Sequence, residues 1–152
     1  MSEVLSFKNL TLVRDGKNLL EDVSWSVSAD QRWVIVGPNG AGKTSLLKLA
    51  AAQLQPSSGS AQILGETLGE INVFELRTRI GFASSAVAGR IPNSEPVLDA
   101  VMTASYAITG RFKEKYDEVD IRRAKRVLKE WDLGHLADRA FGTLSDGEKK
   151  RT

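Results

Sequence analysis

The residues best suited to chemistry lie between positions 37 and 44, where the chain reads Gly-Pro-Asn-Gly-Ala-Gly-Lys-Thr. This spacing matches G-x-x-x-x-G-K-[ST], a phosphate-binding loop. Its glycines lack a Cβ, so the backbone can turn tightly and direct its N–H groups inward as a nest for an anion. Lys43 would reach the β- and γ-phosphates, and the Thr44 hydroxyl would ligate Mg²⁺.

The elements on either side of this loop favour phosphate binding over an ordinary glycine turn ahead of a core helix. The apolar run 33–36 predicts a buried strand over 32–36. A helical pattern then predicts a helix over 43–53, with Leu46, Leu47, Ala50 and Leu54 on one face. The positive end of the helix dipole would face the phosphates.

Composition sets few limits on function. The 152 residues favour one domain, and a net charge of +2 indicates no particular partner. The chain has no Cys and only one His, His135, which excludes disulfides, thiolate metal sites and a histidine cluster. No apolar run approaches the ~18 residues of a membrane span, and the N-terminus does not resemble a signal peptide. We therefore expect a cytoplasmic protein without a direct membrane span.

The first half of the chain predicts an antiparallel layer around the loop. Residues 3–13 indicate a strand bent at Asn9, followed by a turn at 14–17 and a second strand through Val27. Further along, we predict a strand over 60–64, a helix over 72–78, a strand over 79–83 that ends near Ser84–Ser85, and a loop over 86–95. This loop is a candidate subdomain boundary.

The second half is helical. Apolar spacing predicts helices over 97–108 and 120–131. The mixed charges of residues 111–126 are typical of a solvated face, with nucleic-acid binding as the less favoured alternative. Trp25, Trp33 and Trp131 fall on apolar faces and are interpreted as core residues.

A second motif, Leu144-Ser145-Asp146-Gly147-Glu148, follows these helices. Taken alone, Ser145-x-x-Glu148 predicts a capping box that opens a helix. A helix start with a hydroxyl and a glycine is also a potential second anion site.

Together these motifs resemble an ATP-binding cassette (ABC) ATPase. Residues 37–44 match its Walker A loop, residues 144–148 match its Leu-Ser-Gly-Gly-Gln signature, and Glu21-Asp22-Val23-Ser24 matches the segment ahead of the Walker A strand. Ser145 lies 102 positions after Lys43, similar to transporter cassettes. The resemblance covers the whole chain.

The resemblance implies an α/β fold: a P-loop NTPase with a RecA-like core, an antiparallel β subdomain and a helical subdomain. Residues 1–88 would form the β subdomain and the first part of the core, and residues 89–152 the helical subdomain, with the Walker B segment not yet reached. Two such cassettes sandwich two ATP molecules, so Ser145 and Gly147 would contact the γ-phosphate held by the partner. The implied ATP·Mg²⁺ site comprises Gly37, Pro38, Asn39, Gly40, Ala41, Gly42, Lys43, Thr44 and Ser45, with Thr44 as the metal ligand.

Four departures from the family pattern concern this site. Arg14 stands near the position of an adenine-stacking aromatic residue and would stack through its guanidinium. Ser84 and Ser85 stand where the Q-loop glutamine is expected, and Ser85 is the candidate replacement. In the signature, Asp146 replaces a glycine and Glu148 replaces the glutamine. The 152 residues contain no Walker B aspartate, catalytic glutamate or switch histidine, so we expect no ATP turnover by this chain alone.

Function is therefore predicted as the ATP-binding subunit of an ABC transporter, a cytoplasmic protein that can also lie at the inner face of the plasma membrane. Its partners would be a second nucleotide-binding domain, in a homo- or heterodimer, and transmembrane transporter subunits. One alternative is a soluble ABC ATPase acting on ribosomes or nucleic acid. The absence of Cys and the short spacing between the motifs argue against the repair members of that class. Another alternative is a nucleotide-binding regulator without turnover.

Overall fold

The computed structural model describes residues 2–109 and 116–152 of the chain. The chain divides into two compact units, Met1–Ile80 and Gly81–Thr152. The boundary suggested by the sequence, at 88/89, falls inside the second unit. Of the charged residues in the run over 111–126, Arg111, Lys113, Glu114 and Lys115 lie outside the described residues.

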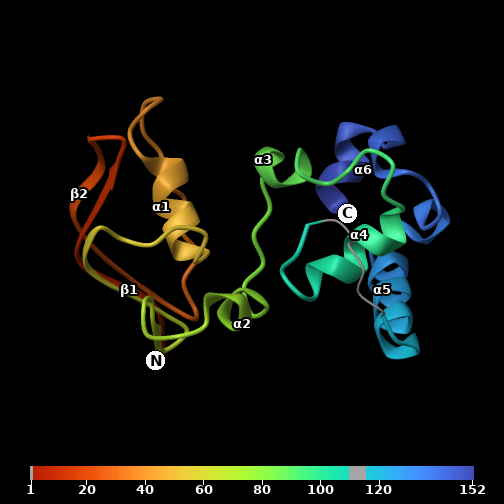
Figure 1. Ribbon diagram of the computed structural model, residues 1–152, viewed down its shortest axis with the longest axis horizontal. Helices are drawn as coiled ribbons and strands as arrows, with labels where there is room; N and C mark the ends of the chain where they lie inside the picture. Colours follow the sequence, from red (N-terminus) through yellow and green to blue (C-terminus); the bar gives the residue numbers. More distant parts are fainter. Residues whose placement is uncertain (1, 110–115) are drawn as a thin grey trace. The chain divides into compact units, whose positions relative to one another are not determined.

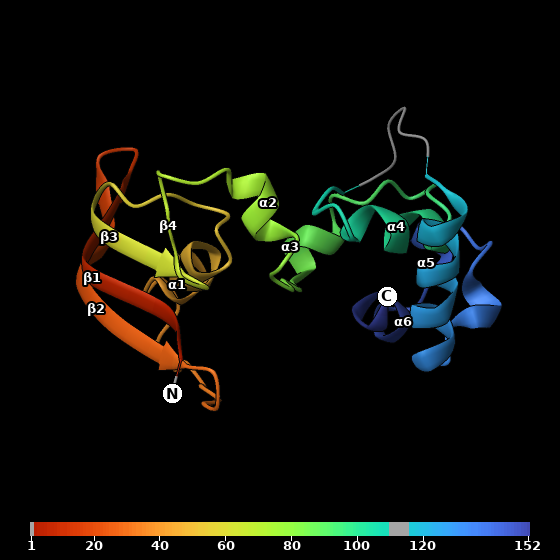
Figure 2. The same ribbon diagram turned by 90° about the horizontal axis from the view of Figure 1, so that it is seen from below.

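A four-stranded antiparallel sheet forms the body of the first unit, in the order β2-β1-β3-β4. The strands are β1 (Glu3–Arg14), β2 (Lys17–Ser28), β3 (Ser58–Ile63) and β4 (Glu66–Thr67). β1 and β2 form the hairpin that the sequence predicted, with Arg14 paired to Lys17 at its turn (Figure 2). The predicted antiparallel layer is thus confirmed.

The predicted bend at Asn9 is a bulge in β1. The pairing register with β2 shifts between Phe7 and Leu10, and Asn9 has a left-handed φ of 46°. Asn tolerates this region better than most residues. Asn9 is held there because its backbone N–H donates to Ser24 Oγ (3.0 Å) and its side-chain amide donates to Asp22 Oδ1 (2.9 Å).

Helix α1 (Lys43–Ala50) follows the glycine loop and covers one face of the sheet (Figure 1). Its fully buried Leu49 joins the core formed by the inward side chains of the strands, which include Leu5, Phe7, Leu10, Leu12, Ala61 and Ile63. The helix ends three residues before the predicted residue 53, since Ala52 adopts a left-handed φ of 53°. The core contact of Leu49 fixes the helix, and with it the loop that precedes it.

Two predicted strands, 32–36 and 79–83, are not strands in the structure. The prediction of burial is also wrong for the first, because Val34 and Val36 are each 85% exposed. Apolar, β-branched residues favour a strand only where a neighbouring strand satisfies the backbone. Within residues 2–109 and 116–152, no strand pairs with either segment.

The apolar pattern also predicted that all three tryptophans are core residues, and this is wrong for two of them. Trp25 packs against the core of the first unit, but Trp33 is 54% and Trp131 58% exposed. Trp33 still contacts the edge of Trp25, with ring centroids 5.7 Å apart, and its Nε1–H donates to Gln31 Oε1 at 3.1 Å. The segment ahead of the glycine loop is therefore tied to β2 by side chains.

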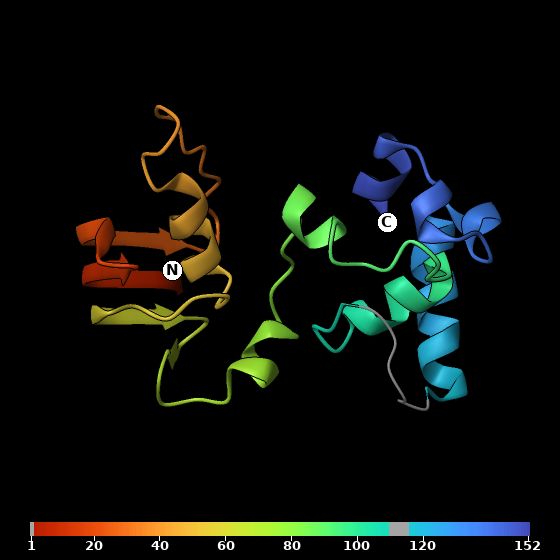
Figure 3. The ribbon, with the colours of Figure 1, turned by 45° about the horizontal axis from the view of Figure 1, so that its top comes forward.

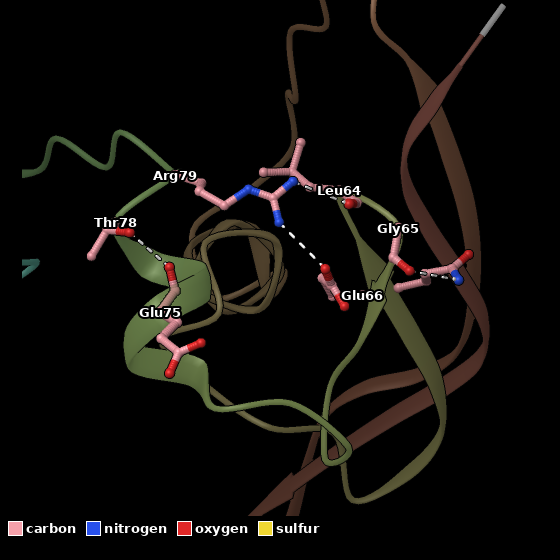
Figure 4. A network of polar contacts seen from close by, with 7 residues as sticks. Leu64, Gly65, Glu66, Glu75, Thr78 and Arg79 are labelled. Carbon is pink, nitrogen blue, oxygen red and sulfur yellow. Dashed lines mark hydrogen bonds and ion pairs between the residues drawn. The ribbon is translucent and has the colours of Figure 1, made fainter.

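The first unit ends with α2 (Val73–Arg77), which was predicted over 72–78. Just after it, Arg79 reaches back to the β3–β4 turn, where its guanidinium pairs with Glu66 Oε1 and donates to the Leu64 carbonyl, each at 3.4 Å (Figure 4). These contacts fasten the end of the unit to its sheet.

The second unit is helical, as predicted. Its elements are α3 (Ser85–Ala88), α4 (Val97–Ala104), α5 (Glu118–Glu130), the 3-10 turns Gly134–Leu136 and Phe141–Thr143, and α6 (Asp146–Arg151). Its core comprises Val97, Ala100, Leu128, Leu133, Leu136, Phe141 and Leu144. The prediction of a loop over 86–95 is wrong for its first residues, because Ser84 caps the short helix α3 there.

Candidate functional site

The glycine loop curls around the side chain of its own lysine. Lys43 Nζ donates to the carbonyl oxygens of Gly37 (2.7 Å) and Pro38 (2.6 Å), and Ala41 N–H donates to the Pro38 carbonyl at 3.3 Å. The ammonium group therefore lies at the inner side of the loop, where an incoming anion would meet it. Residues 37–41 are exposed, so the loop is open to a ligand.

Gly42 shows why this loop can approach the sheet so closely. Its φ is 83°, and a Cβ at this position would lie 2.6 Å from the Leu19 carbonyl oxygen and 2.8 Å from Leu20 Cδ2. Both atoms belong to β2, so only a residue without a side chain fits at the start of α1. Gly40 has a similar φ of 85°, but a Cβ there would meet nothing within 4 Å.

The start of α1 offers free donors beside the lysine. Gly42 is its N-cap, and no side chain caps the helix. The first N–H groups of a helix have no intrahelical partner, which makes such an end a favourable place for an anion. Thr44 and Ser45 lie in this first turn, and Thr44 is exposed. The loop, Lys43 and Thr44 are therefore brought together as the sequence predicted.

Arg14 lies at the end of β1 and is fixed by backbone acceptors. Its guanidinium donates to the carbonyls of Val13 (3.2 Å) and Gln55 (3.4 Å). The second bond links the β1–β2 turn to the segment after α1, and Arg14 itself is exposed.

The serines predicted at the Q-loop position begin α3. Ser84 is its N-cap, and the hydroxyl accepts a hydrogen bond from the Val87 N–H at 3.2 Å. Ser85 follows as the first helical residue and is exposed. The Ser-x-x pattern ahead of Val87 is the signal from which α3 could have been predicted.

Ser145 and Glu148 form the predicted capping box at the start of α6. The Ser145 N–H and hydroxyl donate to Glu148 Oε2 at 2.7 and 2.8 Å, while the Glu148 N–H donates back to Ser145 Oγ at 3.3 Å. The backbone bond, and then the hydroxyl bond, hold the pKa of Glu148 below its ordinary value. A Cβ at Gly147 would meet nothing within 4 Å, so the backbone here is open to close approach.

The site residues thus fall into two groups. Arg14 and residues 37–45 belong to the first unit, whereas Ser85, Ser145 and Gly147 belong to the second. No group of three or more His, Cys, Asp or Glu side chains in the described part of the chain could hold a metal ion. None of the described helices is long and apolar enough to cross a membrane.

Both motifs lie in a stretch of the chain that is similar to one known protein family. The ABC transporter family model matches residues 20–152, which include both motifs. The chain belongs to the ABC transporter family. The predicted Walker A loop (residues 37–44) and the predicted signature (Leu144–Glu148, called the signature segment below) both lie within this match.

Individual ABC proteins resemble this one along nearly all of its length. It is 37% identical over 147 residues to a putative ABC transporter ATP-binding protein of Streptococcus mutans, and 36% identical over 151 residues to the uncharacterised ABC transporter ATP-binding protein YlmA of Bacillus subtilis. Each alignment covers 97% of this chain and 56% of the relative. The chain thus spans about half the length of these curated relatives.

The fold agrees with this assignment. A dimeric bacterial ABC transporter cassette has a TM-score of 0.78 to this structure at 21% identity, covering 97% of this chain and 66% of the cassette. Likeness at this level of identity shows the fold, which is that of an ABC-type P-loop NTPase. The α/β fold class predicted from the sequence is confirmed.

Proposed function

We propose that this chain binds ATP with Mg²⁺ as the nucleotide-binding part of an ABC transporter. The observation that carries the proposal is the placement of Lys43 Nζ inside the glycine loop, at the uncapped start of α1. A nucleotide phosphate would replace the two carbonyls as the partner of this ammonium. The exchange is favourable because a phosphate places a full negative charge opposite the ammonium, whereas a carbonyl presents only a dipole.

The residues present fit Mg²⁺ as well as phosphate. When bound, the metal neutralises charge on the β- and γ-phosphates. The Thr44 hydroxyl would hold it, because it lies exposed in the first turn of α1, next to Lys43. The N–H groups of residues 40–45 would bind the phosphate oxygens. Arg14 would stack on the base, with its position set by the bond to the Gln55 carbonyl.

The signature segment would serve the partner's nucleotide rather than its own. We propose a dimer of cassettes, homo- or heteromeric, in which Ser145 and Gly147 contact the γ-phosphate bound by the other protomer. The dimeric cassette of the same fold supports this arrangement. The Ser145 hydroxyl donates a hydrogen bond to the Glu148 carboxylate, so contact with a phosphate requires the hydroxyl to exchange one anionic acceptor for another.

In this proposal, only the complete dimer hydrolyses ATP. Phosphoryl transfer needs a group that orients the attacking water, in addition to the charge stabilisation that the two motifs supply. We propose that Ser85 replaces the Q-loop glutamine and acts through a bridging water, and that transmembrane transporter subunits bind the helical unit. Cytoplasmic placement, at the inner face of the membrane, follows from those partners.

A nucleotide-binding regulator without turnover is the second candidate. The observation that favours it is the commitment of the Ser84 hydroxyl to the α3 cap, which leaves only the short Ser85 side chain at the Q-loop position. The two candidates differ in whether bound ATP is hydrolysed.

Phosphate release by the full-length protein, measured against protein concentration, separates these functions. The transporter proposal predicts that activity per protomer rises with concentration, because each site is completed by a second protomer. Ser145→Arg should abolish this activity by its bulk and leave ATP binding intact. Activity per protomer that stays constant down to monomer concentrations would refute the dimer mechanism, and an absence of release at every concentration would favour the regulator.

A further inference from the structure

Two segments of the helical unit pair with each other just ahead of the signature segment. Residues 93–98 lead into α4, and residues 137–142 lead toward α6 (Figure 3). Four backbone bonds join them: Val97 N–H to the Arg139 carbonyl (2.9 Å), Leu98 N–H to Ala137 (2.9 Å), Phe141 N–H to Glu95 (2.8 Å) and Gly142 N–H to Asn93 (2.8 Å). An isolated antiparallel bridge joins Pro96 to Ala140. These paired segments are called the brace below.

The closest approach in the brace is between Gly142 and Asn93. A Cβ at Gly142 would lie 2.7 Å from Asn93 Cβ and 2.9 Å from the Asn93 carbonyl oxygen. The φ of Gly142 is not positive, so its backbone conformation does not itself demand glycine. Glycine is required here by the contact itself, and neither neighbouring atom is the end of a flexible side chain.

The brace is connected rigidly to Ser145. Only Thr143 and Leu144 separate Gly142 from Ser145. The guanidinium of Arg139 donates to the Thr143 carbonyl at 2.7 Å, and the Thr143 hydroxyl donates to the Ala140 carbonyl at 2.7 Å. Leu144 is buried in the core of the unit. Because a close-packed core leaves little room for side chains to adjust, a displacement at Gly142 also displaces Ser145.

The same core also includes the segment that follows the Q-loop position. Ala88 at the end of α3 and Ile91 just beyond it pack against the cluster that contains Val97 and Leu144. The brace therefore connects two places that the proposed function uses: the start of α3, with Ser84 and Ser85, and the signature segment.

We propose that the contact between Asn93 and Gly142 positions the signature segment for the partner's nucleotide. Asn93 and Gly142 are positioning residues in this proposal, since neither contacts the nucleotide. It rests on the proposed function, because it assumes that Ser145 completes the ATP site of a second protomer.

Gly142→Ala in the full-length protein tests the proposal. The added methyl must displace Asn93 or residues 143–145. We expect the Kd for ATP to change less than about twofold and maximal phosphate release to fall about tenfold, the rate equivalent of about 1.4 kcal/mol. The protein concentration needed for half-maximal activity should rise, because a misplaced signature weakens the closed dimer. A variant that only folds less completely would also lose activity. Its half-maximal concentration, expressed as folded protein, would however stay at the wild-type value.

The matched control is Gly134→Ala in the same unit. It has no positive φ, and a Cβ there would lie 4.0 Å from the nearest atom, Lys129 Cα. This variant should match the wild type in activity, in ATP affinity and in its concentration dependence.

A double variant tests whether the contact with Asn93 causes the loss of activity in Gly142→Ala. Asn93→Gly removes the Asn93 Cβ and side chain but keeps the carbonyl that accepts from Gly142, so Asn93→Gly/Gly142→Ala should regain part of the lost activity. Arg139→Ala loosens the link to Thr143 without a steric clash, and should also raise the half-maximal concentration. This second variant tests the brace even if Gly142→Ala folds poorly.

The outcomes separate this inference from the proposed function. A wild type without concentration-dependent phosphate release contradicts the proposed function, and the inference with it. An active wild type whose Gly142→Ala and Arg139→Ala variants keep wild-type concentration dependence contradicts the inference alone. Loss of activity in Gly142→Ala without a rise in the half-maximal concentration would refute the role of the Asn93 contact in positioning the signature segment.

Discussion

Glu148 accepts two hydrogen bonds from Ser145 on one carboxylate oxygen, from the backbone N–H at 2.7 Å and from the hydroxyl at 2.8 Å. The capping box therefore depends on the charge of Glu148. The carboxylate also lies in the first turn of α6, where negative charge is favoured. In this chain, the acidic replacement of the signature glutamine stabilises the local structure that presents Ser145.

This relationship predicts a pH dependence of stability. Because the folded state lowers the pKa of Glu148, its contribution is present above the unfolded value of 4.5 and is lost as the pH falls through the lower folded value. Glu148→Gln should therefore lower the melting temperature at neutral pH, with a difference from wild type that shrinks below pH 4.5. Melting curves between pH 7 and 3 check this, and a difference that grows on acidification would contradict it.

The two left-handed glycines of the Walker A loop predict unequal effects of alanine. Gly40→Ala and Gly42→Ala share the cost of a left-handed residue, about 1–2 kcal/mol. Gly42→Ala additionally places its Cβ against the Leu19 carbonyl, whereas Gly40→Ala meets open space. We expect Gly42→Ala to lower the free energy of unfolding by about 1–3 kcal/mol more than Gly40→Ala.

Urea unfolding followed by tryptophan fluorescence measures this difference, since Trp25 and Trp33 both lie in the first unit. Gly40→Ala is the matched control for backbone strain. Equal destabilisation by the two variants would show that α1 does not press on β2 at Gly42.

How much of this molecule could be predicted depends on the range of the interactions. The P-loop, the β1–β2 hairpin, the Asn9 bend and the Ser145 capping box arise from neighbouring residues, and the sequence predicted all four. The 32–36 segment has the composition of a buried strand, yet Val34 is exposed, because a strand also needs a distant partner that composition does not specify.

The brace illustrates the other limit of sequence reasoning. Gly142 reads as an unremarkable glycine between two helical patterns, and its close approach to Asn93 appears only when segments far apart in the chain are placed side by side. The capping pattern of Ser84, by contrast, is local, and α3 could have been predicted from it.

Arg14 predicts weak selectivity among nucleotide bases. Stacking of a base on an aromatic side chain is worth about 1–3 kcal/mol, and an arginine stands at the corresponding position here. ATP and GTP should therefore bind with Kd values within about tenfold of each other, and Arg14→Tyr should strengthen ATP binding by up to about tenfold. Fluorescence titrations with both nucleotides check this, and a hundredfold preference for ATP in the wild type would reveal another base-binding platform.

The most direct test of the central claim is a calorimetric titration of ATP·Mg²⁺ into the wild type and Lys43→Ala. The substitution removes the ammonium that the loop encloses through the carbonyls of Gly37 and Pro38. Lys8→Ala, an exposed lysine on β1 of the same unit, is the control for lost charge. We predict that Lys43→Ala weakens binding at least about tenfold, or about 1.4 kcal/mol, with Lys8→Ala unchanged. Equal affinity of Lys43→Ala and the wild type would contradict the account.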